Sequence, residues 1–453
     1  MKAFWIRKER TRPRRALPGV LLALGFLAGS SEARVVESDL FIEEKIVEIA
    51  GHPTRALMIN GQIPAPTLRW REGDTARIRV HNALETSASV HWHGLLLPNG
   101  QDGVPGVTNT PIEPGTSHVF EFPLRQSGTY WYHSHSGLQE QRGLYGAIVI
   151  EEKDPSDEPD RDHVVVLSDW THERPEEILR LLKSGNEVFS REKGSLQTVW
   201  GAYRAGGLNA MLKRSLNRMP PMDASDVAYD AFLTNGAREQ TLEGLPGERV
   251  RLRVVNAAAS SYFYLDYAGG PLEIIAADGK DVEATDLGRV LIAVAETYDV
   301  IVEVPAHGKA EFRATAQDGS GHTSLWIGQG EKHPAEDVPP PDLYAAHSGH
   351  NPAGEHLAAS SEISSHHDTG EHREPGDPHP NALEAQPTMK IAHGKEHGSR
   401  PPNRPMAPYR WLRSNESTAL PRSAPRREIR LELTGDMERY VWSFDGKTLS
   451  EAD

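Results

Sequence analysis

Two His-X-His motifs are the parts of this sequence best suited to chemistry: His-Trp-His at residues 91–93 and His-Ser-His at residues 133–135. Because successive side chains of a β-strand point to opposite faces, the two histidines of each motif project side by side from one face. Imidazole binds copper, zinc, iron or nickel, and no carboxylates are interleaved here as they are in a calcium or magnesium loop. If the two strands face each other, four imidazoles converge on a metal.

The segments around these motifs resemble the first copper-ligand region of the multicopper oxidases, most of all in their bacterial copper-resistance branch. The resemblance rests on HWHG from residue 91, DGVPGVTNTPIEPG from residue 102 and GTYWYHSHSGLQEQRGLYGAIVIE from residue 128. Members of this family pass electrons from a reducing substrate through a blue type 1 copper to a trinuclear cluster, where dioxygen becomes water. The resemblance implies a copper-dependent oxidase whose partners are O2 and a reducing substrate, either Cu(I) or a phenol-like compound.

The same resemblance implies a role for each motif residue. His91 would bind the type 2 copper of the cluster. His93, His133 and His135 would bind the type 3 pair. Asp102 resembles an acidic residue that lies near the type 2 copper and its proton path in relatives. A turn residue ahead of a glycine is the other interpretation of Asp102, and the sequence leaves both open.

Two further motifs of the family, HPxHLHG and HCHxxxH, do not occur in the sequence, which also contains no cysteine. A blue copper site needs a cysteine thiolate beside two histidines. We therefore expect this chain alone to supply half of a trinuclear site, to bind metal weakly and to have negligible oxidase turnover. Two alternatives remain open: a periplasmic copper-binding or sequestering protein without turnover, and a copperless structural relative of the oxidases.

The charge and the N-terminal segment bear on partners and location. A net charge of −15 over 453 residues argues against nucleic acid or an anionic membrane as a partner. Residues 1–33 combine a basic stretch, an apolar run at 16–29 and small residues at 31–33, which predicts a signal peptide. Arg14-Arg15 resembles a twin-arginine signal, and the apolar run is too short for a stable membrane span. We expect export to the periplasm by the twin-arginine machinery.

An internal repeat predicts the fold. An NG turn, a Gly-acid turn and an alternating strand ending in Asn recur from Asn60 to Asn82 and from Asn235 to Asn256. Short strands separated by Gly/Pro turns favour a mainly β protein of tandem cupredoxin-like Greek-key β-sandwiches, with domains at 34–155 and 160–330. In the second unit Leu265 takes the place of His91, so only the first domain should carry copper ligands.

Three further segments interrupt or follow this pattern. Helical spacing of apolar residues predicts an α-helical insertion at about 172–222, in which Met211, Met219 and Met222 are either packing residues or Cu(I) ligands. Residues 332–410 are polar and contain ten histidines, which predicts a disordered linker that is either a simple spacer or a weak Cu(II) binder. Residues 425–453 resemble the start of a third cupredoxin domain, so we expect a fragment of a longer enzyme, arising by truncation, frameshift or a split gene.

Overall fold

The structure is a computed structural model that describes residues 33–153, 159–184, 188–204, 207–209, 211–212, 225–341, 404–421, 423–436, 441–448 and 451. Residues 1–32, and with them nearly all of the predicted signal peptide, lie outside this set. So do Met219, Met222 and residues 342–403 of the predicted histidine-rich linker.

Residues 35–151 form a sandwich of two four-stranded sheets, the first sandwich. Its sheets have the strand orders β2-β1-β4-β6 and β3-β8-β7-β5. Consecutive strands repeatedly change sheet, and the pairs β1–β4 and β3–β8 are parallel, as in a Greek-key arrangement. The strands are β1 (Val35–Ile49), β2 (His52–Ile59), β3 (Ala65–Arg71), β4 (Thr75–Asn82), β5 (His91–His93), β6 (Ser117–Pro123), β7 (Gly128–His133) and β8 (Tyr145–Glu151).

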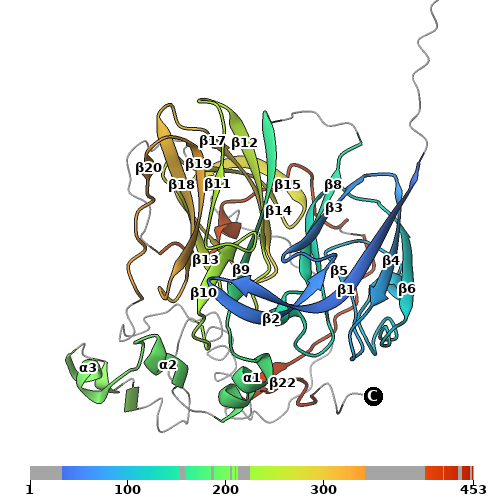
Figure 1. Cartoon of the computed structure of the whole chain (residues 1–453), viewed down its shortest axis with the longest axis horizontal. Helices are drawn as coiled ribbons and strands as arrows, with labels where there is room; N and C mark the ends of the chain where they lie inside the picture. Colours follow the sequence, from blue (N-terminus) through green and yellow to red (C-terminus); the bar gives the residue numbers. More distant parts are fainter. Residues whose placement is uncertain are drawn as a thin grey trace, which may run out of the picture.

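Residues 161–333 form the second sandwich. One sheet has the order β10-β9-β12-β17-β14-β15, and the other has the order β11-β19-β18-β13-β16 with β20 beside β18. Figure 1 shows the two sandwiches side by side, the first on the right and the second on the left. The strands are β9 (Arg161–Trp170), β10 (Ala231–Thr234), β11 (Glu239–Leu242), β12 (Arg249–Asn256), β13 (Phe263–Tyr267), β14 (Leu272–Ala277), β15 (Lys280–Leu287), β16 (Arg289–Ile292), β17 (Thr297–Glu303), β18 (Gly308–Ala316), β19 (His322–Gln329) and β20 (Lys332–His333).

Alternation of side chains along the strands builds the two cores. In β4, Ala76, Ile78 and Val80 are fully buried, whereas the arginines between them lie toward solvent. In β13, Leu265 and Tyr267 belong to the hydrophobic core of the second sandwich. The positions that correspond to the first histidine motif are thus filled by packing residues, as the repeat predicted.

The described residues between β9 and β10 include the helices α1 (Pro175–Lys183), α2 (Val188–Glu192) and α3 (Val199–Arg204), inside the predicted helical insertion. Proline and two glutamates open α1, and Lys183 closes it, an arrangement that suits the helix dipole. Figure 1 places these helices below the two sandwiches. Within the described residues, no helix has the length and apolar character needed to cross a bilayer.

The chain that follows β19 packs onto the second sandwich in places where the sequence predicted a linker. Lys332–His333 forms β20, and Ala335 and Val338 are buried. The short 3-10 helix η3 (Pro408–Arg410) precedes Leu412, which joins the core of the second sandwich. The first residues of the predicted linker, 332–410, thus pack against the second sandwich, and Pro408 near its end is buried.

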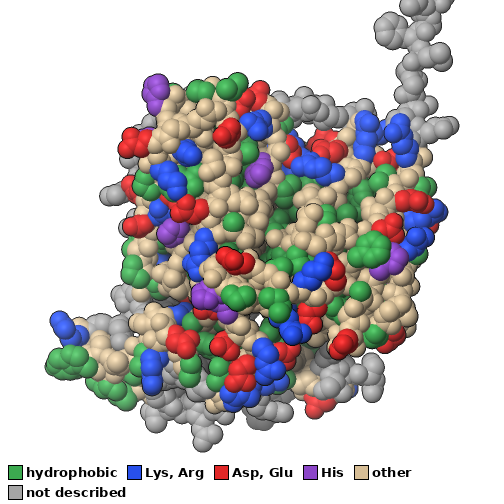
Figure 2. Space-filling model, in the orientation of Figure 1, with side chains coloured by type: hydrophobic (Ala, Val, Ile, Leu, Met, Phe, Trp, Pro, Cys, Tyr) green, Lys and Arg blue, Asp and Glu red, His purple; other side chains and the backbone are tan. Residues whose placement is uncertain are grey.

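The last described segment is a hairpin of β21 (Leu433–Asp436) and β22 (Val441–Phe444), which pair antiparallel. Its side chains Leu433, Trp442 and Phe444 are exposed. Elsewhere on the surface, Figure 2 shows positive and negative side chains interspersed over the visible face, so the net negative charge is not gathered into one patch there.

Candidate metal centre

The two histidine motifs lie on neighbouring strands of one sheet. β5 pairs antiparallel with β7, and His91 stands directly opposite His133. Trp92 and Tyr132, the opposing pair next along the ladder, are fully buried in the core of the first sandwich. Because side chains alternate across a strand, burying this aromatic pair turns the imidazoles to the other face of the sheet. The motif pairing predicted from the sequence is therefore present.

Three of the four predicted ligands converge. One ring nitrogen from each of His91, His93 and His133 lies within 4.8 Å of the others. The closest pair is His93 Nδ1 and His133 Nε2, which are 3.3 Å apart. His135 follows the end of β7 and is exposed, with its ring centroid 5.0 Å from that of His91 and 4.8 Å from that of His133. The fourth imidazole thus stands beside the group of three rather than within it.

Oxygen acceptors orient two of the rings. His91 Nδ1 lies 2.8 Å from the carbonyl oxygen of Asp102 and 3.5 Å from its carboxylate Oδ1. His133 Nδ1 lies 2.8 Å from Glu140 Oε2. Because neither a carbonyl nor a carboxylate oxygen donates a proton, both Nδ1 atoms must donate, which leaves each Nε2 lone pair for a metal. An oxygen atom that accepts a hydrogen bond from a histidine in this way is the usual outer support of a metal ligand.

A tight loop brings Asp102 to His91. The loop contains the 3-10 helix η1 (Asn99–Gln101). Asn109 fastens it, since its Oδ1 accepts from Gly103 N at 2.7 Å and its Nδ2 donates to Gly100 O at 2.8 Å. Gly103 has a φ of +83°, and a Cβ there would lie only 1.8 Å from the carbonyl oxygen of Val90. Only glycine allows the loop to approach the strand this closely.

Partial burial favours the neutral form of His91, His93 and His135. Desolvation, together with positive charge on the neighbouring histidines, lowers the pKa of His93 to about 4. Burial likewise lowers the pKa of His91 and of His135 below the ordinary histidine value. A metal that binds these rings at neutral pH therefore has no proton to displace from them.

Two residues of the centre were not predicted from the sequence. Trp131 stacks on His133 with ring centroids 4.0 Å apart and an interplanar angle of 11°. Its position two residues before His133 was a usable signal, because such residues share a strand face. Glu140 lies in the 3-10 helix η2 (Glu140–Arg142), where no spacing rule connects it to a histidine.

The donor set suits copper. Three neutral imidazoles, with a fourth beside them, form a borderline-soft nitrogen site of the kind that copper prefers. The sequence has no cysteine, so the thiolate that a blue type 1 site needs does not come from this chain. The residues present therefore fit part of a copper assembly.

Comparison with known proteins agrees with this geometry. Family models described as multicopper oxidase match residues 42–155 and 161–325. The chain is 36% identical to Copper resistance protein A of Escherichia coli, over 91% of this chain and 77% of that protein. It is 41% identical to Copper resistance protein A of Pseudomonas syringae pv. tomato, over 71% of this chain and 53% of that protein.

Solved structures share the fold. A laccase from Botrytis aclada superposes with a TM-score of 0.55 at 26% identity, covering 69% of this chain and 56% of the laccase. The Blue Copper Oxidase from Nitrosomonas europaea superposes with a TM-score of 0.51 at 24% identity, covering 65% of this chain and 86% of that one. The predicted tandem cupredoxin-like architecture is thereby confirmed. The chain belongs to the multicopper oxidase family, as a copper-dependent oxidoreductase of the copper-resistance type.

Proposed function

We propose that His91, His93, His133 and His135 are the first sandwich's half of a trinuclear copper cluster. The convergence of three ring nitrogens within 4.8 Å is the observation that carries this assignment. Bound copper would supply the one-electron chemistry that couples oxidation of a reductant to reduction of O2. In this proposal the predicted domains, 34–155 and 160–330, divide the work, with all copper ligands of the chain in the first.

The protein groups around the rings hold and move protons. The Nδ1–H groups of His91 and His133 donate to their oxygen acceptors, which leaves the opposite nitrogens unprotonated. The carboxylate of Asp102 lies 3.5 Å from His91 Nδ1 and is 28% exposed, so it touches both the site and solvent. Reduction of O2 to water consumes protons. We assign Asp102 the role of carrying these protons from solvent to the copper site.

Cu(I) is the substrate that we propose. The relatives reported above are named for copper resistance, and converting Cu(I) to Cu(II) would serve that purpose. We further propose that residues 1–33 export the protein to the periplasm by the twin-arginine route, which suits a protein that folds before transport. A phenol-like reductant is the alternative substrate.

Equilibrium copper titration of the purified chain tests the site. We expect His93→Ala and His133→Ala to weaken Cu(II) binding by at least about tenfold, because each removes a direct ligand. His81→Ala is the matched control, since His81 is in β4 of the other sheet, where it contacts Ser117 of β6 and Asp39 of β1. Unchanged affinity in both site variants, or a purified chain that takes up no copper, would contradict the assignment.

A second function, copper binding without turnover, is favoured by the missing thiolate in the sequence. An oxygen electrode separates the two. If the copper-loaded chain consumes no O2 with Cu(I) or a phenol, this chain acts by binding alone. Oxygen uptake that disappears in His133→Ala would instead show that these residues sustain turnover without a type 1 site.

A further inference from the structure

Strand β7 reaches from the candidate copper site to the second sandwich. Thr129, near its start, is 1% exposed. Its hydroxyl donates to Asp299 Oδ1 at 2.6 Å and accepts from Arg253 Nη1 at 3.0 Å. Arg253 is in β12 and Asp299 is in β17. The strand that carries His133 is thus held by side chains of a sandwich in which we propose no copper ligand.

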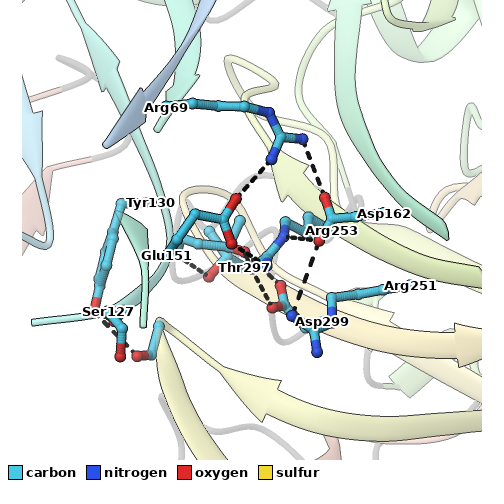
Figure 3. A network of polar contacts seen from close by, with 11 residues as sticks. Arg69, Ser127, Tyr130, Glu151, Asp162, Arg251, Arg253, Thr297 and Asp299 are labelled. Atoms are coloured by element: carbon cyan, nitrogen blue, oxygen red, sulfur yellow. Dashed lines mark hydrogen bonds and ion pairs between the residues drawn. The ribbon is translucent and has the colours of Figure 1, made fainter. Parts of the chain in front are cut away.

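The holding pair is itself rigidly placed. Arg253 Nη1 donates to Asp299 Oδ2 at 2.9 Å, and Arg253 Nε donates to Asp162 Oδ2 at 2.6 Å (Figure 3). Arg253 is 3% exposed and Asp299 is 4% exposed. A buried ion pair tolerates little displacement, because a separated charge in this environment loses both water and partner.

The backbone at the start of β7 is held as well. Thr297 Oγ1 donates to the carbonyl oxygen of Thr129 at 3.0 Å, and the hydroxyl of Tyr130 lies 3.0 Å from the carbonyl oxygen of Gly279. A Cβ on Gly128 would lie 2.5 Å from the same Gly279 oxygen. Side-chain and main-chain contacts therefore fix both the direction and the depth of the strand against the second sandwich.

A chain of side-chain contacts along one face of β7 connects this anchor with the candidate copper site. Thr129, Trp131 and His133 alternate with two tyrosines and share that face. Trp131 is 2% exposed and packs with Val166 and Val255 of the second sandwich. The same indole stacks on the His133 ring at 4.0 Å. A shift of Thr129 would move the Trp131 indole, and the stacked His133 imidazole would move with it.

We propose that the Arg253–Asp299 ion pair is a positioning device for the copper ligand His133, acting through Thr129 and Trp131. The inference rests on the proposed role of His133 as a ligand. It gives the second sandwich a defined part in the chemistry: it sets the orientation of one imidazole from the far end of the strand.

The decisive variants are Thr129→Val and Thr129→Ser. Valine has nearly the shape of threonine but has no hydroxyl, whereas serine keeps the hydroxyl. Asp299→Asn removes the negative charge of the carboxylate that accepts the hydrogen bond from Thr129. Thr54→Val is the control, because the Thr54 hydroxyl also reaches the second sandwich, 2.9 Å from His172 Nδ1, but its partner does not belong to the Arg253–Asp299 network.

The first measurement is the NMR signal of the His133 ring in the metal-free chain labelled with [13Cε1]histidine, identified by its loss in His133→Gln. Stacking on an indole displaces this signal, so it reports ring position independently of copper. We expect Thr129→Val and Asp299→Asn to move it and to weaken Cu(II) binding by about tenfold, as outer-shell changes do. Thr129→Ser and Thr54→Val should match the unsubstituted chain in both respects.

A His133 signal that stays in place in folded Thr129→Val would overturn the proposal, even if thermal stability falls, because the anchor would then be structural only. If Asp299→Asn does not fold, the threonine pair still decides. If the unsubstituted chain binds no copper while Thr129→Val moves the ring, the positioning stands and the assignment of His133 as a ligand fails.

Discussion

The indole of Trp131 lies nearly parallel to the imidazole of His133, 4.0 Å away, and also contacts His93 with a centroid distance of 5.0 Å. One aromatic side chain therefore forms the floor under two of the three converging rings. The floor is dry, since Trp131 is 2% exposed. It excludes water from one side of the site and limits how far the rings can turn.

Replacing Trp131 should lower both the stability of the fold and the affinity for copper. We expect Trp131→Ala to lower the free energy of unfolding by about 3–5 kcal/mol, the usual effect of emptying a buried tryptophan site. Trp170→Ala is the control, because Trp170 is 3% exposed in a different cluster. Urea denaturation should show similar losses, whereas copper titration should show weakening only in the Trp131 variant. Equal copper affinities would mean that the stacking does not orient the ligands.

Glu140 should strengthen copper binding through the hydrogen bond that it accepts from His133 Nδ1. Glu140→Gln removes the charge from the 2.8 Å contact, so the ring becomes a weaker ligand and turns more freely. We expect Cu(II) affinity to fall about 10- to 100-fold, the range found for supports of metal-bound histidines. Competition titration against a chelator measures this change. Glu113→Gln, at an exposed position in another loop, should leave the affinity as it was.

The loop that carries Asp102 can be tested with two glycines of the same conformation. Gly103 and Gly106 have φ values of +83° and +74°, but only at Gly103 would a Cβ meet other atoms. Gly106→Ala should cost about 1–2 kcal/mol of unfolding free energy, the strain of a left-handed residue. Gly103→Ala should cost more and should also weaken copper binding, because the loop must move away from His91. Identical effects would show that the close approach is not needed.

His163 gives the stability a defined pH dependence. Burial lowers its pKa below the ordinary value of 6.5; the charge of Asp162 opposes this shift, and the charges of Arg161 and Arg69 add to it. With its pKa lowered on folding, the unfolded chain binds the proton more readily, so acid favours unfolding as pH falls through 6.5. The unsubstituted chain should therefore lose more stability than His163→Gln between about pH 7.5 and pH 5. Parallel urea titrations at both pH values test this, and equal losses would contradict it.

The inner part of the site could be predicted because it depends on local rules. A His-X-His spacing on a strand fixes which side chains share a face, and the repeat around Asn82 and Asn256 fixes the tandem fold. Glu140 reaches His133 through an irregular turn, and no residue pattern encodes that path.

The anchor joins Thr129 to Arg253 and Asp299, each more than a hundred positions away along the chain. It exists only once two independently patterned sandwiches dock, so alternation within each strand gives no hint of it. The ordered segment around Val338 was missed for a related reason. Single apolar residues in polar surroundings find their sites only on a completed surface.

The contact between the sandwiches also decides how far this protein can be dissected. The family models divide the chain between residues 155 and 161, and the proposed copper ligands all lie on one side of that division. A fragment cut there would nevertheless leave Trp131, Tyr145 and Ala147 facing water, since their cluster is completed by Val166 and Val255. We therefore expect that a unit that keeps the imidazoles in place must include β9, β12 and β17, and that a miniature copper protein designed from this chain must supply substitutes for them.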